Sequence, residues 1–240
     1  MIDNLPTAID VISNNYEGVP YEAIEYLRNH AVSSEVLPQI IEHLDNAYFT
    51  VSNSEAFSTS SLWMAVVAEK HLDKSLIKPV TSIFTTIDYG WDFLEEQCGY
   101  LVGLLAEKYP EETISYIFEV IEKQIDIGSE SAYLYLFDII YFANIDSYRE
   151  RIIRLLLKPK FKWLDAYVNY LANIQMRDAI PTLKLLINKE FHSSFMQNEI
   201  KHSLYCLENN IVEFPELAKP YSKTRESWKP HYQKIEAFFV

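Results

Sequence analysis

Glycine and cysteine are scarce in this chain, and each scarcity excludes a class of structure. Only 5 of the 240 residues are glycine, and no alternating strand pattern bounded by hairpin turns is present, which argues against a β-sheet protein. The two cysteines, Cys98 and Cys206, are too few for a disulfide framework in a chain of this size. Both lie within helical apolar patterns, so we expect them to be buried free thiols.

Long apolar runs and targeting signals are also missing. No run of 18 apolar residues occurs, and the nearest stretch, from Tyr133 to Ile145, is interrupted by Asp138 and Asn144. The first residues, Met1 to Asn4, lack the basic and apolar regions of a signal peptide. We therefore expect a soluble, cytoplasmic protein with no membrane partner.

The motifs that carry common chemistries are absent as well. The sequence has no His-Glu-x-x-His, no Gly-x-Gly-x-x-Gly, no Gly-Lys-Ser/Thr and no Gly-x-Ser-x-Gly. Glu199, His202 and Cys206 share one helical face, but a di-iron bundle needs the Glu-x-x-His element twice and further glutamates. We predict no catalytic residue, no metal and no cofactor.

A repeated pair of helices is what the sequence does contain. Its clearest copy has an apolar helix over 165–174, a polar turn over 175–178 and a second helix over 179–187. Asp178 is expected to cap the second helix through a backbone N–H, and Pro181 falls in the first turn, where a missing N–H costs nothing. The second-helix anchor recurs at Leu37, Ile77, Ile114, Arg149 and Ile180. A period of this length is typical of stacked-helix arrays.

The run Asp178-Ala179-Ile180-Pro181-Thr182-Leu183 resembles HEAT-like repeats of the PBS-lyase type. Residues 19–24 and 34–38 are similar to an uncharacterised bacterial HEAT-like family. Over residues 20–210, the resemblance implies an all-α, right-handed α–α superhelix of about six helix pairs. Residues 1–213 are expected to form the array. Residues 214–240, rich in proline and aromatic side chains and basic in charge, are expected to cap its last repeat, or alternatively to contact the acidic half of the same molecule or of a second copy.

Charge is distributed very unevenly. The net charge is −13, and residues 1–120 hold 19 acidic and 5 basic side chains, whereas residues 121–240 hold 15 acidic and 16 basic ones. Arg28 is the only basic residue before Glu69. Two interpretations are open: the acidic surface confers solubility, or it attracts a basic partner. Its field repels phosphate, which argues against binding of nucleic acid by this half.

The densest acidic group surrounds Gly90 and comprises Asp88, Trp91, Asp92, Glu95 and Glu96. Three interpretations are open: the negative first turn of a helix, a partner-binding patch, or paired carboxylates for acid–base catalysis. A second charged group, between Arg149 and Lys162, is basic. It is expected either to contact phosphates or to complement a helix C-terminus.

These patterns favour a non-enzymatic scaffold that binds a basic protein partner on its concave face. The acidic half would steer the partner, and Asp88, Trp91, Asp92, Glu95 and Glu96 would form the contact patch; an immunity or antitoxin-like protein is one concrete form of this hypothesis. Two alternatives follow from the HEAT-like resemblance. One is an enzyme or accessory lyase-like subunit with a pocket in the solenoid, and the other is a DNA-repair-type HEAT protein.

Overall fold

The computed structural model describes residues 2–14, 18–47, 60–86, 92–140, 145–187, 193–215 and 227–238. It is 79% helical, and its described part contains 13 α-helices and no strand, which confirms the all-α prediction. The α-helices are α1 (Leu5–Ser13), α2 (Tyr21–Asn29), α3 (Ser33–Asp45), α5 (Ser60–Ala68), α6 (Ile77–Thr86), α7 (Asp92–Lys108), α8 (Pro110–Ile127), α9 (Phe137–Ile140), α10 (Ile145–Leu155), α11 (Leu164–Asn173), α12 (Ile180–Leu186), α13 (Ser194–Asn209) and α14 (Trp228–Phe238). Three short 3-10 helices, η1 (Lys74–Leu76), η2 (Ala132–Leu136) and η3 (Arg177–Ala179), precede α6, α9 and α12.

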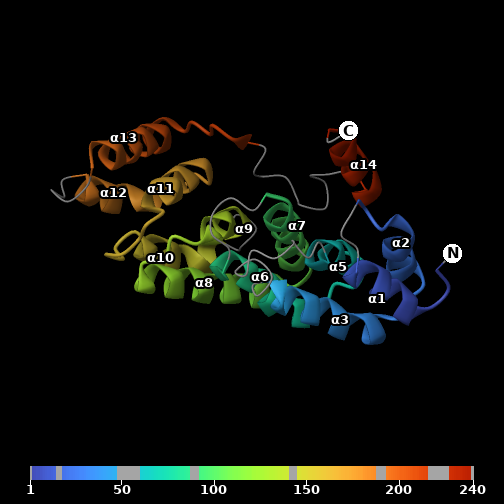
Figure 1. The fold of residues 1–240 in the computed structure, drawn as a ribbon. Coiled ribbons are helices and arrows are strands. Elements are labelled where there is room, and N and C mark those ends of the chain that lie inside the picture. Colours follow the sequence, from blue (N-terminus) through green and yellow to red (C-terminus); the bar gives the residue numbers. More distant parts are fainter. Residues whose placement is uncertain are drawn as a thin grey trace.

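Most of these helices lie in two rows, one above the other (Figure 1). Helices α3, α6, α8 and α10 form one row, and α2, α5, α7 and α9 form the other. Within the rows α3 contacts α6, α6 contacts α8, α2 contacts α5 and α5 contacts α7. Helices that follow one another along the chain, such as α3 and α5 or α6 and α7, contact each other across the rows. Each helix therefore packs mainly on its near neighbours in sequence.

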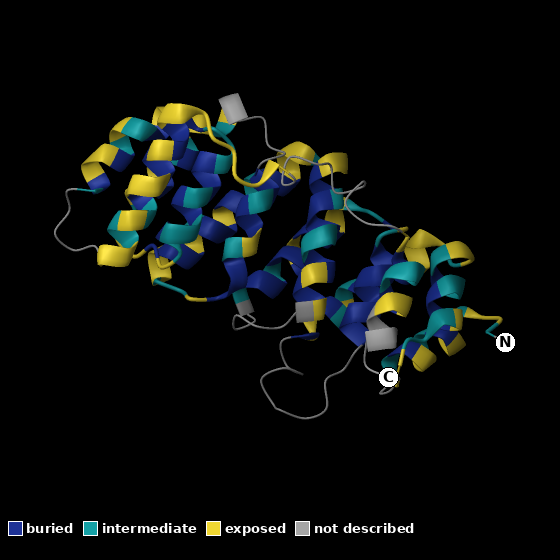
Figure 2. Ribbon diagram, turned by 90° about the horizontal axis from the view of Figure 1, so that it is seen from above, coloured by how far each residue is buried: buried dark blue, intermediate teal, exposed yellow. Residues whose placement is uncertain are grey.

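The apolar stripes predicted from the repeat form the core between the rows. The five anchors lie on α3, α6, α8, α10 and α12: Ile77 and Ile114 are buried, Leu37 and Ile180 are half-buried, and Arg149 is exposed. The apolar residues that follow the anchors at helical spacing on the same helices are mostly buried (Figure 2). They are Ile40, Leu44, Val80, Phe84, Ile117, Ile121, Ile152 and Leu183. Helix α5 is buried on all sides, because all nine of its residues are buried. A helix that is apolar on every side needs cover on every side.

Cys98 and Cys206 are buried free thiols, as predicted. Within the described ranges, no helix is long and apolar enough to cross a membrane.

Asp178 does not cap the second helix of its repeat, contrary to the prediction. A 3-10 turn, η3, lies directly before α12, so the cap position falls on Ala179, which makes no side-chain cap hydrogen bond. The Asp178 carboxylate instead pairs with Arg149. The same local geometry precedes α6, where Asp73 accepts a hydrogen bond from the Ser75 amide at 2.9 Å and caps the turn rather than the helix. Pro181 lies in the first turn of α12 as expected.

The basic group between Arg149 and Lys162 contacts carboxylates of the neighbouring helices. Arg151 binds both oxygens of Glu122 on α8 at 2.8 and 2.9 Å. Lys158 lies 2.6 Å from Asp126, and Lys162 lies 2.9 Å from Glu130. These contacts join residues about one repeat apart. They explain why cations concentrate here without invoking phosphate binding.

Helix α14 lies away from the helices that precede it in sequence. In Figure 1 it lies beside α2 and α5, at the opposite end from α12 and α13. Its aromatic side chains contact Tyr21 of α2 and Trp63 of α5. The second interpretation of the C-terminal segment, a basic tail against the acidic half of the same molecule, describes these contacts correctly.

Candidate functional site

The main candidate site is the surface on which α14 rests. We call it the α14 seat and define it by Tyr21, Glu25 and Arg28 of α2, Trp63 of α5, and Glu96 and Gln97 of α7. Three kinds of contact hold α14 there: aromatic stacking, a buried polar network and charged contacts at the rim.

Two aromatic side chains of α14 anchor it in the seat. The Trp228 ring stacks on Tyr21, with centroids 5.8 Å apart and an angle of 29° between planes, and the Arg28 guanidinium lies 5.4 Å from the Trp228 ring centre. One turn later, the Tyr232 ring meets Trp63 edge-on at 5.1 Å. Trp228 and Tyr232 are only 5% and 3% exposed. Aromatic pairs of this geometry add about 0.5–1.5 kcal/mol each beyond their buried area.

A chain of polar side chains lies beneath these rings. Arg28 contacts Glu69 Oε2 at 3.0 Å, and the Gln97 amide donates to Glu69 Oε1 at 3.0 Å. The Tyr232 hydroxyl completes the chain by donating to Gln97 Oε1 at 3.1 Å. The side chains of Arg28 and Glu69 are only 7% and 10% exposed. A buried ion pair needs such supporting hydrogen bonds, because taking two charges out of water is costly.

This network shows that the charge of Arg28 is used inside the protein. From the sequence it is the single cation in a long acidic stretch. In the structure its charge is directed inward to Glu69 and its guanidinium also contacts the Val66 carbonyl. Arg28 therefore contributes little positive charge to the outer surface of α2.

The rim of the seat pairs carboxylates with Lys229 and His231 of α14. Lys229 Nζ lies 3.8 Å from Glu25 Oε1 and 5.7 Å from the centre of the Tyr21 ring. His231 Nε2 lies 3.5 Å from Glu96 Oε1. Both pairs are partly exposed, so each contributes at most about 1 kcal/mol to stability. Their value lies in orienting a basic helix on an acidic surface.

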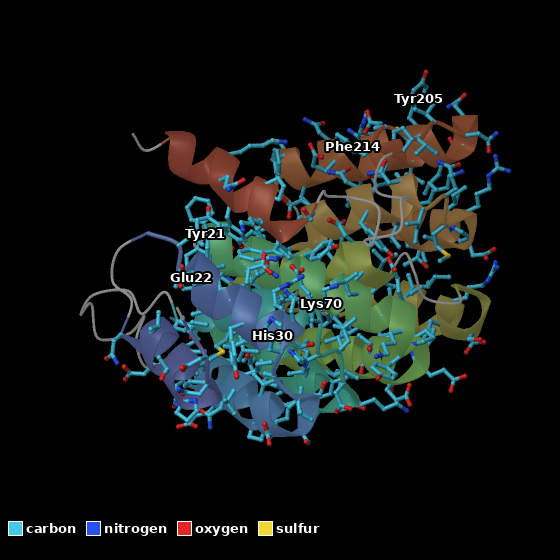
Figure 3. All side chains as sticks on the ribbon, turned by 90° about the vertical axis from the view of Figure 1, so that its right-hand side faces the viewer. Tyr21, Glu22, His30, Lys70, Tyr205 and Phe214 are labelled. Carbon is cyan, nitrogen blue, oxygen red and sulfur yellow. The ribbon has the colours of Figure 1, made fainter. Side chains whose placement is uncertain are left out.

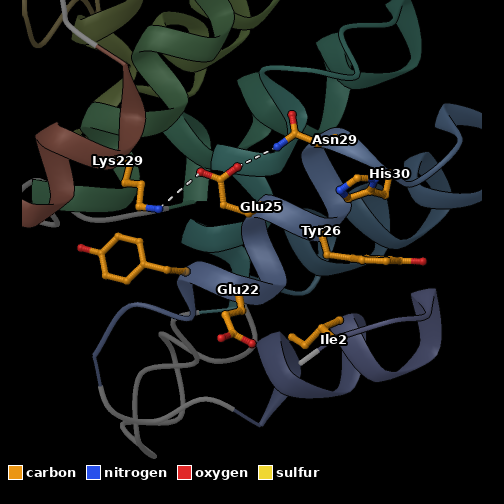
Figure 4. Close-up of a pocket in the computed structure, with 8 residues that line it drawn as sticks. Ile2, Glu22, Glu25, Tyr26, Asn29, His30 and Lys229 are labelled. Atoms are coloured by element: carbon orange, nitrogen blue, oxygen red, sulfur yellow. Dashed lines mark hydrogen bonds and ion pairs between the residues drawn. The ribbon is translucent and has the colours of Figure 1, made fainter.

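A cavity of about 390 Å³ adjoins the rim (Figure 4). Its lining combines carboxylates, aromatic rings and an amide, contributed by Ile2, Tyr21, Glu22, Glu25, Tyr26, Asn29, His30 and Lys229. Glu25 accepts a hydrogen bond from Asn29 at 2.7 Å while it faces Lys229. Carboxylates beside aromatic rings attract ammonium and guanidinium groups. Figure 3 shows Tyr21 below α14 and Tyr205 on α13, which lies away from α2 in Figure 1.

The structure places the residues of the predicted acidic patch in different environments. Asp88 and Trp91 lie outside the described residues, and so does the side chain of Asp92, where α7 begins. Glu95 is buried, whereas Glu96 is exposed at the rim of the α14 seat. The start of α7 at Asp92 agrees with the helix-start interpretation of these carboxylates. Of the five, Glu96 is the one that a described contact connects to α14.

The sequence analysis did not identify most residues of the seat. Tyr21, Glu25, Trp63 and Gln97 stand in ordinary helical patterns, and no local motif distinguishes them. The one available signal was the isolation of Arg28 among acidic residues, because a lone cation in such a stretch needs a partner.

A second candidate site lies on α13 and the turn after it. His202 Nε2 is 2.9 Å from Glu213 Oε2 and 3.7 Å from Cys206 Sγ. Glu199, which the sequence placed with His202 and Cys206, instead accepts a hydrogen bond from Asn169 at 2.8 Å. Its place in the group is taken by Glu213, which follows the end of α13 and therefore shares no helical periodicity with the other two.

The Cys206 thiol has the wrong electrostatics for a nucleophile. Burial, and then the nearby Glu213 charge, raise the pKa of Cys206. A reactive cysteine needs a lowered pKa instead. In addition, Glu213 and Cys206 approach the same nitrogen of His202, whereas a catalytic triad uses one ring nitrogen for the nucleophile and the other for the carboxylate.

In comparisons with known proteins, no family model, no curated protein and no solved structure matches this chain.

Proposed function

We propose that this chain is a non-enzymatic, HEAT-like protein-binding module whose α14 seat holds a basic, aromatic helix of a partner protein. The observation that carries the proposal is the present occupant of the seat. Helix α14 places Trp228, Lys229, His231 and Tyr232 against Tyr21, Glu25, Trp63 and Glu96. A partner helix with the same side chains in the same order would find the same contacts.

The charge of the N-terminal half supports a basic partner. Residues 1–120 hold 19 acidic and 5 basic side chains, and one of those five, Arg28, is buried against Glu69. Such a surface raises the rate at which a cationic partner arrives, and the rate falls as salt screens the field. The cytoplasmic location expected from the sequence forms part of the same proposal.

The stacked-repeat architecture is supported by the sequence separation of the polar contacts. Gln97 binds Glu69 across 28 residues, Arg151 binds Glu122 across 29, and Ser33 contacts His71 across 38. Regular contacts at about one repeat length are what a HEAT-like superhelix requires, because each unit packs only on its neighbours.

In this proposal the partner helix takes the place of α14. Helix α14 is then an internal competitor, and the apparent affinity for the partner is reduced by the fraction of molecules in which α14 occupies the seat. Weakening the anchors of α14 should therefore strengthen binding of an external helix.

A labelled peptide of residues 227–238 provides a defined probe. We expect it to bind the full chain carrying W228A/Y232A, as measured by fluorescence anisotropy at low salt, and to bind the unmodified chain at least tenfold more weakly. Binding to the variant should weaken as salt rises. The variant Tyr205→Ala, which removes an exposed aromatic residue on α13, should behave like the unmodified chain.

Two further variants separate binding from folding. Glu25→Gln and Glu96→Gln, added to W228A/Y232A, remove the rim charges without adding volume. We expect them to lower the affinity of the chain for the peptide. If W228A/Y232A remains helical by circular dichroism yet binds no peptide, then α14 is a structural part of the fold and the seat is not a binding site. The same variants can be used to capture proteins from a lysate. If W228A/Y232A captures basic proteins and the variants without the rim charges do not, the result extends to a natural partner.

A further inference from the structure

The side chains of His202, Cys206 and Glu213 converge from two segments of the chain. His202 and Cys206 lie one turn apart on α13, so their side chains project from the same face. Glu213 comes back toward them after Asn210, whose left-handed backbone (φ 57°) ends the helix. One nitrogen, one sulfur and one carboxylate oxygen then all lie within 4.8 Å of one another.

The turn that carries Glu213 is held by the preceding helical unit. The amides of Glu213 and Phe214 both donate to Asn173 Oδ1 at 3.2 Å. The Gln175 side chain donates to the Ile211 carbonyl at 2.8 Å, and the Ile211 amide donates to the Cys206 carbonyl at 2.9 Å. Because both ends of the turn are fixed, the Glu213 carboxylate is kept close to α13.

The spacing of these atoms fits a tetrahedral metal ion. Zinc bonds of about 2.0–2.3 Å to nitrogen, oxygen and sulfur place neighbouring ligand atoms roughly 3.3–3.6 Å apart. The separation of His202 Nε2 from Cys206 Sγ is 3.7 Å, close to that value, and the separation from Glu213 Oε2 is 2.9 Å. The carboxylate would have to withdraw by roughly 0.5 Å to admit the ion. The side chains of His202 and Glu213 are 48% and 40% exposed, so they are free to make this adjustment.

We propose that His202, Cys206 and Glu213 form a binding site for a zinc ion. The ion would bind Nε2 of the imidazole, the sulfur of the thiolate and one carboxylate oxygen, and it would leave a fourth position to water. An ion pair alone accounts for the contact between His202 and Glu213. The Cys206 sulfur at the same ring nitrogen adds a third donor atom, which the ion pair does not use and a metal ion does. The site lies on α13, apart from the α14 seat, and it does not depend on the proposed protein-binding function.

Cobalt(II) is a suitable probe, because its complexes with thiolate absorb in the near ultraviolet whereas those with only nitrogen and oxygen ligands do not. The tag-free full chain is titrated with cobalt and then with zinc. We expect a thiolate-to-cobalt band that saturates at one equivalent and disappears when zinc displaces cobalt. The band is assigned to Cys206, since Cys98 belongs to no group of three metal-ligating side chains among the described residues.

Two variants test the other ligands, and a third serves as a control. His202→Ala and Glu213→Gln alter exposed side chains, so the fold should survive, and each is expected to weaken cobalt and zinc binding at least tenfold. Glu199→Gln changes a carboxylate of the same helix that contacts Asn169, and it should bind like the unmodified chain. The proposal is overturned if the unmodified chain gives no thiolate band, or if the band persists with unchanged affinity in His202→Ala and Glu213→Gln.

Discussion

The hydroxyl of Tyr232 donates a hydrogen bond to the side-chain oxygen of Gln97 across 135 residues of sequence. Gln97 in turn donates to Glu69, which pairs with Arg28. One bond thus connects α14 to a network that spans α2, α5 and α7. Beside this hydrogen bond, the Tyr232 ring packs edge-on against Trp63.

Removing only the Tyr232 hydroxyl should show how much its hydrogen bond to Gln97 contributes to stability. In Tyr232→Phe the ring contact with Trp63 remains, while the Gln97 oxygen loses its donor in a buried position. We expect a loss of about 1–2 kcal/mol in the free energy of unfolding, measured by urea denaturation. Tyr205→Phe, at an exposed position on α13, should change it by less than about 0.5 kcal/mol. Equal effects of the two substitutions would show that the hydrogen bond contributes nothing.

Arg28→Met should be among the most damaging single changes in the chain. It leaves Glu69 as a buried carboxylate without its cation, which costs about 3–5 kcal/mol in comparable pairs. The double change R28M/E69M removes both charges, and we expect it to recover part of that loss. Lys74→Met breaks the exposed pair with Glu112 and should leave the free energy of unfolding nearly unchanged, because water screens such a pair. If R28M/E69M is no more stable than Arg28→Met, the buried charge is not the cause.

Asp138 should make stability depend on pH. Burial raises the pKa of Asp138 from 3.8 to about 6. The folded state therefore holds this proton more tightly than the unfolded chain does. The resulting stabilisation is complete below the unfolded pKa and is lost as pH rises through about 6.

Asp138→Asn removes the charge that is buried at neutral pH. At pH 7 we expect it to raise the free energy of unfolding by about 1–3 kcal/mol, and we expect this gain to shrink toward pH 4. Urea denaturation at several pH values measures the difference. The exposed Asp3 offers a control, since Asp3→Asn should give a small difference that does not change in this way. A gain for Asp138→Asn that is constant with pH would contradict the prediction.

The residues of the basic group between Arg149 and Lys162 should contribute unequally to the stability of the fold. Arg151 binds Glu122 through two nitrogens and lies 4.9 Å from the ring centre of Phe118. Arg151→Ala is therefore expected to cost about 1–2 kcal/mol. Lys162 is half-exposed and contacts the exposed Glu130, so Lys162→Ala should have a much smaller effect than Arg151→Ala. Thermal unfolding of both variants at low and high salt would test the order.

The parts of this structure that could be predicted are those that local patterns determine. Apolar residues at helical spacing placed Val80, Phe84, Ile117 and Ile121 in the core, and helix formation followed from the same spacing. The burial of Cys98 and Cys206 followed in the same way. These properties depend on residues within a few turns of one another, so a single sequence contains them.

The rest depends on contacts between distant segments. The partner of Arg28 is 41 residues away, and that of Tyr232 is 135 residues away. No periodicity marks such pairs, so the contacts of α14 with α2 and α5 could not be predicted from the sequence. Asp178 shows a smaller failure of the same kind, because the 3-10 turn before α12 shifts the helix start by one residue. Glu213 joined His202 only because a left-handed residue reverses the chain after α13.

The distance in sequence between α14 and its seat also sets an order of events during synthesis. Helices α2, α5 and α7 are complete by Lys108, so they can pack together long before the ribosome has made Trp228. Until then Trp63 and Gln97 of the nascent chain lack their contacts with Tyr232. The seat therefore stays without α14 for the time needed to make the following 120 or so residues, roughly 6–24 seconds at typical elongation rates. In that interval a chaperone or an early partner can reach the seat without competition.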